Sequence, residues 1–457
     1  MIKKVLIANR GEIAVRIIRT CRELGIQTVA VFSEADRYAL HTELADEAVC
    51  IGPARSTDSY LNMENILSAA INLGADAIHP GFGFLAENSR FAEMCEACQI
   101  KFIGPKAQTI DEMGNKINAR RLMIEAGVPV IPGSDGVIAT VEEAEAIASQ
   151  IGFPVMLKAA AGGGGKGIRK VLSEQELGAH FQSAQQEALA AFGNGDMYLE
   201  KIIYPAKHIE VQILGDQFGH IIHLGERDCS LQRNNQKVLE EAPAFSLPTD
   251  IREQIGQAAI KAAQAVRYEN AGTIEFLVDE DNRFYFMEMN TRIQVEHPVT
   301  EMITGIDIVA QQLKIASGLE LSIQQEDVHF QGHAIECRIN AENPRFNFAP
   351  FPGPIKELIL PGGGLGVRVD SAVYQGYTIP SYYDSMIAKV ITHGKTREEA
   401  LNKMHRALVE LVIEGVLTNQ EFQMDLISHP SIRQGLYTTA FLQETFLPEW
   451  LNVAEEE

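Results

Sequence analysis

The chain has 457 residues, 39 lysines and arginines against 61 aspartates and glutamates, and a formal net charge of −22. This length exceeds one ordinary hydrophobic core and predicts about three domains. The charge argues against partners that are nucleic acids or anionic membranes, and the lack of a signal-peptide pattern or a membrane-spanning apolar run predicts a cytoplasmic protein.

Residues 1–103 alternate predicted strands and helices. The strands are expected at Lys4–Asn9, Gln27–Phe32, Glu47–Ile51, Ala75–His79 and Ile100–Ile103, with helices over 12–24, near 61–73 and near 88–98. This alternation predicts a parallel sheet. The first turn, Asn9-Arg10-Gly11-Glu12, has one glycine where a dinucleotide-binding turn needs three, which argues against a nicotinamide enzyme.

Two segments follow that sheet. The loop His79-Pro-Gly-Phe-Gly-Phe-Leu-Ala-Glu87 comes after a strand, at the sheet edge where open α/β sheets bind ligands, which favours a substrate-facing loop. Residues 104–130 predict a helical connector with Thr109 as its N-cap and Gly127-Val-Pro129 as its end. Lys116 lies on its polar face, and by itself indicates only a solvated lysine.

Residues 131–203 predict a small unit built on two strands that flank a glycine-rich loop. The four glycines from Gly162 to Gly165 expose backbone N–H groups that can wrap phosphates. Lys158 interrupts an apolar strand and therefore needs an anionic partner or a route to solvent. A phosphate-binding lid explains both features, whereas a flexible surface hairpin explains the glycines and leaves Lys158 unexplained.

The most informative stretch follows the apolar strand that begins at Phe284. Five polar residues occupy every second position and so share one face of an extended chain: Glu288, Asn290, Arg292, Gln294 and Glu296. A tight turn at Asp281-Asn282 would place Phe284 opposite Asp279 and Glu288 opposite Glu275. Two opposed carboxylates favour a divalent cation held by Glu275, Glu288 and Asn290. The alternative is a solvated sheet edge with spaced charges.

Downstream of this hairpin the pattern is less specific. Gly332–Asn340 predicts a strand with Arg338 near its end, and Thr396-Arg-Glu-Glu399 is a capping box that starts a helix ending near Gly415. The acidic residues 452–457 predict a frayed end.

A glycine-rich hairpin with a lysine, upstream of a carboxylate hairpin, resembles the ATP-grasp superfamily. Within it, the chain resembles the biotin carboxylase family over nearly its whole length. The resemblance rests on these motifs: Ile7–Ile13, His79–Gly83, Lys158 with the glycine run, Glu226–Ser230, Glu288–Glu301 and Glu336–Asn340.

The resemblance implies an α/β ATP-grasp fold. An N-terminal Rossmann-like parallel-sheet domain would span 1–103, a helical linker 104–130 and a small glycine-lid domain 131–203. The ATP-grasp catalytic core and a C-terminal α+β domain would span 204–457. The implied reaction is ATP-dependent carboxylation of carrier-bound biotin by bicarbonate, as the first half-reaction of acetyl-CoA carboxylase in fatty acid synthesis.

The resemblance also implies roles for individual residues. ATP would be bound by Lys116, Lys158, Gly164, Gly165, Glu200, Lys201, Ile202, Ile203, His208, Gln232, Asn235, Glu275, Leu277 and Glu288. Two Mg²⁺ ions, or Mn²⁺, would be bound by Glu275, Glu288 and Asn290. Bicarbonate would lie among Lys237, Arg292, Gln294, Val295 and Glu296, and biotin beside Phe82, Gly83 and Arg338. The catalytic residues would be Arg292, Glu296, Lys237 and Arg338, with Glu296 as the base.

The implied partners are a biotin carboxyl carrier protein, carboxyltransferase subunits and a second copy of the chain, with Arg16 and Arg19 as candidate interface residues. A separate carrier is expected because the chain shows no Met-Lys-Met carrier segment. Three alternatives remain at this point: a part of an acyl-CoA or pyruvate carboxylase, another ATP-grasp ligase joining a carboxylate to an amine, and an inactive nucleotide-binding regulator.

The sequence departs from the family pattern at three positions. Asn235 stands where a histidine is expected near the nucleotide, and Phe82 stands where a tyrosine is usual in the biotin-facing loop. Ala161 shortens the glycine run by one residue. These departures are expected to alter nucleotide affinity or lid motion without removing a catalytic group.

Overall fold

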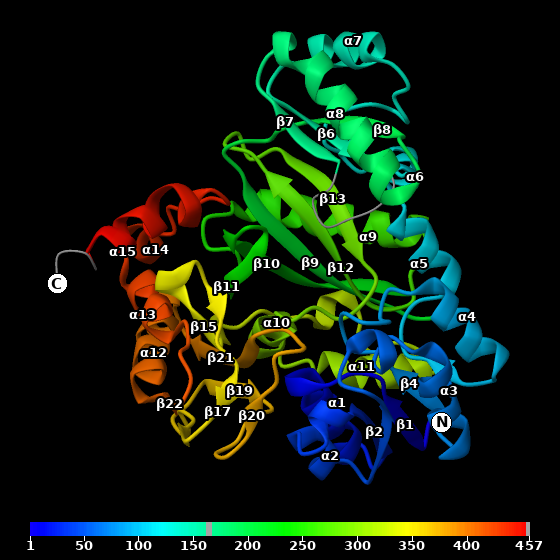
Figure 1. Cartoon of the computed structure of the whole chain (residues 1–457), viewed down its shortest axis with the longest axis vertical. Coiled ribbons are helices and arrows are strands. Elements are labelled where there is room, and N and C mark those ends of the chain that lie inside the picture. Colours follow the sequence, from blue (N-terminus) through cyan, green and yellow to red (C-terminus); the bar gives the residue numbers. More distant parts are fainter. Residues whose placement is uncertain (161–166, 454–457) are drawn as a thin grey trace.

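The computed structural model describes residues 1–160 and 167–453. Helices α7 (Val141–Ile151) and α8 (Glu174–Phe192) lie at the top of Figure 1, the N-terminal region at lower right, and the C-terminal helices at left. Among the described residues, no helix combines the length and the apolar character needed to cross a membrane.

The N-terminal region is a parallel sheet of order β3-β2-β1-β4-β5, as its strand–helix alternation predicted. Its strands are β1 (Lys4–Ile7), β2 (Gln27–Ser33), β3 (Glu47–Gly52), β4 (Ala77–His79) and β5 (Lys101–Phe102). Its helices are α1 (Gly11–Glu23), α2 (Leu40–Leu44), α3 (Met63–Asn72) and α4 (Ser89–Ala97). The strand order reverses between β1 and β4, so the loops after these two strands meet at the edge where such sheets bind ligands.

Two helices, α5 (Ala107–Gly114) and α6 (Lys116–Glu125), form the connector. The prediction of Thr109 as an N-cap is wrong, because α5 begins at Ala107 and Thr109 is buried within it. The cap in this segment is Asn115, whose side chain accepts a hydrogen bond from the Asn118 amide and so places Lys116 in the first turn of α6.

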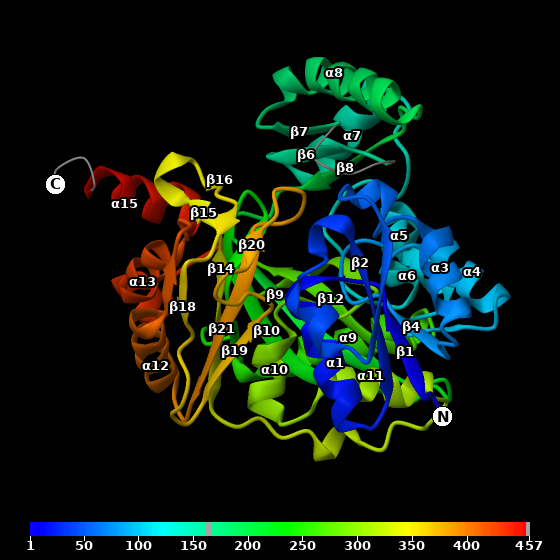
Figure 2. The ribbon, with the colours of Figure 1, turned by 60° about the horizontal axis from the view of Figure 1, so that its bottom comes forward.

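The small unit is a three-stranded antiparallel sheet of order β7-β6-β8 covered by two helices (Figure 2). Its elements are α7 (Val141–Ile151), β6 (Val155–Ala159), β7 (Ile168–Val171), α8 (Glu174–Phe192) and β8 (Met197–Lys201). Strands β6 and β7 flank the glycine run, as predicted. The run itself, with Ala161, Gly164 and Gly165, lies outside the described residues.

An eight-stranded antiparallel sheet of order β13-β12-β9-β10-β11-β14-β21-β19 forms the body. Its strands are β9 (Lys207–Gly215), β10 (Ile221–Arg233), β11 (Gln236–Ala242), β12 (Asn270–Val278), β13 (Phe284–Asn290), β14 (His333–Asn340), β19 (Val367–Ser371) and β21 (Met386–Gly394). Helix α9 (Thr249–Ala265) packs on β9 and β10, α10 (His297–Thr304) on β10 and β14, α11 (Ile308–Ala316) on β12, and α12 (Arg397–Glu410) on β21.

Short elements complete the C-terminal part. They are β15 (Glu342–Asn343), β16 (Ala349–Pro350), β17 (Gly353–Pro354), β18 (Glu357–Ile359), β20 (Thr378–Ile379), β22 (Val412–Glu414), α13 (Gln420–Ser428), α14 (Pro430–Gln434) and α15 (Leu447–Val453). The Thr396 cap is confirmed by its bond from the Glu399 amide. The predicted end near Gly415 is wrong, because Val412–Glu414 leaves the helix to pair with β18.

The β12–β13 hairpin has a register that the sequence pattern predicted only in part. Glu288 lies opposite Glu275, as expected, but Phe284 pairs with Val278 and not with Asp279. The Asp279 carboxylate accepts bonds from the amides of Asp281 (3.0 Å) and Arg283 (2.9 Å), which makes a longer turn. A β-bulge next to Glu275 then shifts the register by one residue and restores the opposition of the two glutamates.

Candidate active site

One cleft of about 1230 Å³ lies between the lid sheet, the body sheet and the loops that follow β1 and β4. Every predicted site residue that the structure describes lines it: Phe82, Gly83, Lys116, Lys158, Glu200, Lys201, Ile202, Ile203, His208, Gln232, Asn235, Lys237, Glu275, Leu277, Glu288, Asn290, Arg292, Gln294, Val295, Glu296 and Arg338. Gly164 and Gly165 lie outside the described residues.

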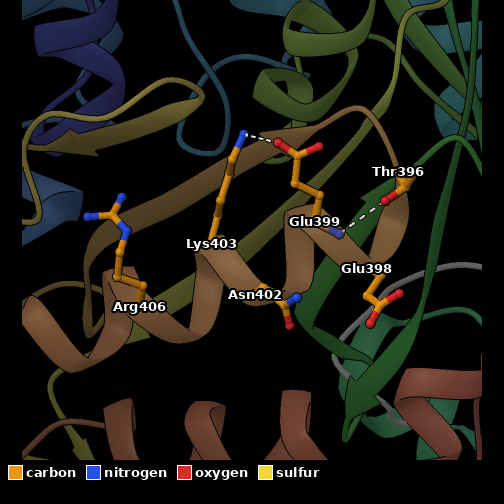
Figure 3. Close-up of a pocket in the computed structure, with 6 residues that line it drawn as sticks. All are labelled: Thr396, Glu398, Glu399, Asn402, Lys403 and Arg406. Atoms are coloured by element: carbon orange, nitrogen blue, oxygen red, sulfur yellow. Dashed lines mark hydrogen bonds and ion pairs between the residues drawn. The ribbon is translucent and has the colours of Figure 1, made fainter.

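A second, open pocket lies on the surface of α12 (Figure 3). Its lining residues are Thr396, Glu398, Glu399, Asn402, Lys403 and Arg406. Lys403 Nζ already lies 2.9 Å from Glu399 Oε1, and Thr396 caps the helix. The pocket is therefore the solvated face of a surface helix.

A row of charged side chains crosses four strands at the floor of the cleft. Glu288 on β13 lies opposite Glu275 on β12, Glu275 opposite Glu210 on β9, and Glu210 opposite Arg227 on β10. Arg227 is fully buried and its Nε donates to Glu210 Oε1 at 2.5 Å. Adjacent strands lie about 4.8 Å apart, so three neighbouring carboxylates need cations between them.

Lys237 supplies the central cation. Its Nζ lies 2.6 Å from Glu210 Oε2, 3.0 Å from Glu275 Oε1 and 2.6 Å from Glu296 Oε1. Burial lowers the pKa of Lys237, but the three carboxylates more than offset burial and hold that pKa well above its ordinary value. The side chain is therefore a charged ammonium in the part of the cleft where an anionic substrate would enter.

Glu296 is the carboxylate that Lys237 and Arg338 share. It is fully buried, and its Oε2 accepts from Arg338 Nη2 at 3.0 Å while Oε1 faces Lys237. Burial alone would raise the pKa of Glu296. The charges of Lys237, Arg338 and Arg227 lower this pKa by more than burial raises it, so it lies well below the usual range. Glu296 is thus an ionised proton acceptor at neutral pH.

Arg292, two residues after the end of β13, contacts three side chains of the site. Its Nη1 donates to Gln294 Oε1 at 2.8 Å and its Nη2 to Asn290 Oδ1 at 3.0 Å. Its Nε donates to Glu87 Oε2 at 2.8 Å, from the loop that follows β4. The prediction of one extended strand is wrong beyond Asn290, because β13 ends there and Arg292, Gln294 and Glu296 lie in the loop that leads to α10. Side-chain hydrogen bonds keep Asn290, Arg292 and Gln294 together, and Glu87 joins them to the N-terminal sheet.

The predicted metal ligands fit a hard divalent cation. Burial and the charge of Glu275 raise the pKa of Glu288, whose nearest cation is Lys116 Nζ at 3.8 Å. Asn290 Oδ1 accepts from Arg292 Nη2 at 3.0 Å and would have to exchange that contact for a cation. Carboxylate and amide oxygens are the ligands that suit Mg²⁺ or Mn²⁺.

Two tighter groups place their ligand atoms within 4.8 Å of one another. One is His208, Glu210 and Glu275, and the other is Glu210, Cys229 and Glu296. Glu288 is in neither group. Glu210 therefore belongs to the acidic centre, although its position in the sequence did not single it out.

The opposite end of the cleft is formed by the lid. Lys158 is half-buried and pairs with Glu200 across β6 and β8, which supplies the anionic partner that the sequence demanded. Lys201 Nζ donates to the carbonyls of Gly152 (2.9 Å) and Phe153 (3.0 Å). His208 Nε2 lies 3.0 Å from Glu275 Oε2, which joins this histidine to the carboxylate row.

The loops after β1 and β4 close the third side. Asn9 Nδ2 donates to the carbonyls of Pro80 and Phe82, both at 2.7 Å, so these loops are held together. Gly81 has φ +62°, and a Cβ there would lie 2.9 Å from Asn9 Nδ2. Only glycine fits this contact, which fixes Phe82 and Gly83 at the cleft.

Four charged residues of the site were not predicted from the sequence: Glu87, Glu210, Arg227 and Glu240. A signal was present for Glu210, because His208, Glu210 and Gln212 alternate along β9 in the same way as the polar residues after Phe284. The Arg338 guanidinium is paired with Glu240, Nε donating at 2.6 Å, across strands distant in sequence. No local sequence pattern predicts that Glu240 is the partner of Arg338.

Comparison with known proteins gives a consistent assignment. The model "Biotin carboxylase, N-terminal domain" matches residues 1–110, "Carbamoyl-phosphate synthase L chain, ATP binding domain" matches 115–324, and "Biotin carboxylase C-terminal domain" matches 336–444. Biotin carboxylase 1 of Bacillus subtilis is 62% identical over 97% of this chain and 98% of its own length. One subunit of the pyruvate carboxylase of Methanothermobacter thermautotrophicus is 53% identical over 97% of this chain and 90% of its own length.

Solved structures agree with this assignment. The biotin carboxylase–β-γ-ATP complex from Campylobacter jejuni is 51% identical, with a TM-score of 0.93 over 97% of this chain and 98% of that chain. The biotin carboxylase domain dimer of Hydrogenobacter thermophilus 2-oxoglutarate carboxylase, solved with MgADP, ADP and bicarbonate, is 52% identical with a TM-score of 0.91, covering 97% of this chain and 98% of that one. The chain therefore belongs to the biotin carboxylase family of ATP-dependent enzymes with an ATP-grasp fold.

Proposed function

We propose that this enzyme carboxylates biotin on a carrier protein, with bicarbonate as the carbon source and ATP converted to ADP and phosphate. The observation that carries the proposal is the position of Lys237, whose ammonium lies among Glu210, Glu275 and Glu296 in the cleft. Arg292 on one side and Arg338 on the other complete a centre that can hold an anion beside an ionised base.

In the first step, bicarbonate is held by Lys237, the Arg292 fork, Gln294 and the Val295 backbone. Two parallel N–H bonds from an arginine suit a planar oxyanion. Glu296 accepts the bicarbonate proton, and the oxygen attacks the γ-phosphorus of ATP. The bond between the γ-phosphorus and the ADP oxygen breaks, which gives carboxyphosphate and ADP. Lys237 stabilises charge on the transferred group.

The nucleotide lies between lid and body in this proposal. Lys116, Lys158 and His208 bind phosphates under Gly164 and Gly165, while Gln232 and Asn235 lie at the near wall. Glu200, Lys201, Ile202, Ile203 and Leu277 surround the adenine. The amides of Lys201 and Ile202 already donate to Pro132 O (2.7 Å) and Pro154 O (3.0 Å). Glu275, Glu288 and Asn290 hold two Mg²⁺ ions, or Mn²⁺, which neutralise phosphate charge when bound.

In the second step, carboxyphosphate separates into CO₂ and phosphate next to biotin. The phosphate takes the proton from biotin N1, and N1 then attacks CO₂ to form carboxybiotin. Arg338 stabilises the negative oxygen that develops on the ureido group, and Phe82 and Gly83 pack beside the ring. Arg338 must exchange its present contacts with Glu240 and Glu296 for this contact.

The final acceptor and the partners are proposed from the relatives. We propose acetyl-CoA, which makes this chain the biotin carboxylase of a fatty-acid-forming carboxylase with a separate carrier and carboxyltransferase subunits. Relatives that belong to a pyruvate carboxylase and to a 2-oxoglutarate carboxylase define the alternatives for the carboxyl acceptor.

We also propose that the enzyme is a homodimer. Arg16 pairs with Glu301 (2.8 Å) and Asp307 (2.9 Å) in its own chain, which leaves Arg19 as the freer interface candidate.

The proposed function is tested by ADP release from ATP and bicarbonate, with saturating Mg²⁺, in the presence and absence of free biotin. Biotin is expected to stimulate ADP release strongly. An Arg338→Ala variant is expected to lose this stimulation and still bind ATP, because Arg338 lies on the biotin side of Glu296. An absence of biotin-stimulated turnover in the wild-type enzyme would overturn the proposal.

Asn235 gives a second test, of nucleotide affinity. Asn234 (φ +49°) and Asn235 (φ +63°) form the two-residue turn between β10 and β11, a left-handed conformation in which asparagine is favoured and histidine is tolerated. An Asn235→His variant is expected to lower the KM for ATP about two- to tenfold by adding one hydrogen bond at the cleft wall. An unchanged KM for ATP would show that Asn235 does not weaken binding.

A further inference from the structure

A buried ammonium lies directly behind the proposed bicarbonate loop. Lys389, on β21, is fully buried, and its Nζ donates to the backbone carbonyl of Val295 at 2.6 Å. The same Nζ lies 3.2 Å from Glu12 Oε1 and 4.0 Å from Asp370 Oδ2. Lys389 thus touches the loop that carries Arg292 to Glu296 without lining the cleft itself.

The sheet register explains this placement. Lys389 lies opposite Arg338 on β14 and opposite Asp370 on β19, so the three side chains form a row on one face of the body sheet. Arg338 reaches the carboxylate of Glu296, and Lys389 reaches the carbonyl of the preceding residue, Val295. Two neighbouring cations therefore hold two neighbouring residues of the loop.

The counter-ion comes from the N-terminal region. Glu12 is in the first turn of α1, within the Ile7–Ile13 motif, and α1 packs against β19 and β21. Its carboxylate is buried, and neither oxygen has a hydrogen-bond partner among the described residues. The Lys389 ammonium, 3.2 Å from Glu12 Oε1, is thus the cation that compensates the buried charge of Glu12.

The loop is also fixed one residue earlier. His297 Nδ1 donates to the Gln294 carbonyl at 2.8 Å, so two successive carbonyls, those of Gln294 and Val295, are both held from the inner side. Glu296 occupies the N-cap position immediately before α10, and its carboxylate contacts Lys237 and Arg338. A buried ion pair is a poor way to gain stability compared with apolar packing, and is better suited to fixing one geometry.

We propose that Lys389, with Glu12 as its counter-ion, is a positioning residue for bicarbonate activation. By fixing the peptide between Val295 and Glu296, it keeps the base aligned with the bicarbonate subsite, and it makes the Ile7–Ile13 motif part of that support. This inference rests on the proposed function. Misplacement of reacting groups by about 1 Å can cost about a hundredfold in rate.

The test is steady-state ADP release by the full-length enzyme, with bicarbonate and ATP varied separately. A Lys389→Met variant is expected to raise the KM for bicarbonate about tenfold or more and to lower kcat, while the KM for ATP changes less than twofold. A Glu12→Gln variant is expected to raise the KM for bicarbonate by a smaller factor. If Lys389→Met does not fold, the bicarbonate KM of Glu12→Gln is compared with that of the wild type instead. Lys389→Arg is expected to restore part of the loss.

Arg397→Met is the matched control. Arg397 is another buried cation of the C-terminal part, but it pairs with Glu241 at 2.6 Å. It is expected to lower Tm and leave the bicarbonate KM unchanged. A bicarbonate KM within twofold of wild type in Lys389→Met and Glu12→Gln, or an equal loss in Arg397→Met, overturns this inference alone. An inactive wild-type enzyme overturns the proposed function, and this inference with it.

Discussion

Replacing Glu296 by glutamine is expected to lower kcat by about 10²- to 10⁴-fold, the range found when a positioned general base is lost. Glutamine keeps the size of the side chain but cannot take the bicarbonate proton. It also removes the negative charge that Lys237 and Arg338 share. The measurement is bicarbonate-dependent ADP release at saturating ATP, with nucleotide affinity measured separately by equilibrium binding.

The control for this variant is Glu399→Gln on the surface of α12. Glu399 pairs with Lys403 in the exposed pocket, so its loss is expected to change kcat by less than twofold. A Glu296→Gln enzyme that retains more than a tenth of the wild-type kcat would contradict the assignment of Glu296 as the base. ATP binding close to that of the wild type is expected, since Glu296 lies on the bicarbonate side of the row.

Replacing Lys237 by methionine is expected to reduce kcat by about 10²- to 10³-fold, because a preorganised cation is removed from the site of phosphoryl transfer. The variant also carries a second signature. Burial raises the pKa of Glu296, and Lys237 is the largest influence that lowers it. Removing Lys237 therefore raises the pKa of Glu296, and the acid limb of the kcat profile is expected to move to higher pH.

The pH profile separates a catalytic loss from a general loss of structure. Lys237→Met leaves Glu210, Glu275 and Glu296 with less compensation, and breaking a buried ion pair typically costs about 3–5 kcal/mol of stability. Thermal unfolding is therefore measured on the same samples, and Lys403→Met on α12 is the control. A fall in kcat with no movement of the acid limb would contradict the coupling between Lys237 and Glu296.

Alternation after Phe284 predicted which polar side chains line the cleft, although the strand ends at Asn290 and the hairpin geometry was partly wrong. Side chains two residues apart share a face in any extended strand, so the common face of Glu288 and Asn290 required no knowledge of the partner strand. The pairing register of β12 and β13, in contrast, could not be predicted without the partner strand. The Asp279 turn and the bulge beside Glu275 compensate for each other, and neither is encoded in the periodicity.

The β6–β7 hairpin and the helix caps likewise separate what a local pattern predicts from what tertiary contacts decide. Glycines and a lysine in an apolar strand predicted the β6–β7 hairpin, because backbone freedom and the cost of an unpaired buried charge are local properties. The partner of Lys158 is Glu200, which lies 42 residues later in the chain, and only strand pairing brings the two together. Local capping rules gave Thr396 correctly but failed for Thr109, which tertiary packing buries inside α5.

The sequence by itself therefore determined the fold class and the β6–β7 and β12–β13 hairpins, and it predicted the residues that line the cleft, since these depend on periodicity, composition or family motifs over short stretches. The tertiary structure alone decided how the charges are compensated. Lys237 joins three carboxylates, from β9, from β12 and from the loop before α10. Arg227 supports Glu210, and Lys389 joins Glu12 to Val295. Electrostatic compensation of a buried site depends on distances in space, and separation along the chain carries no information about it.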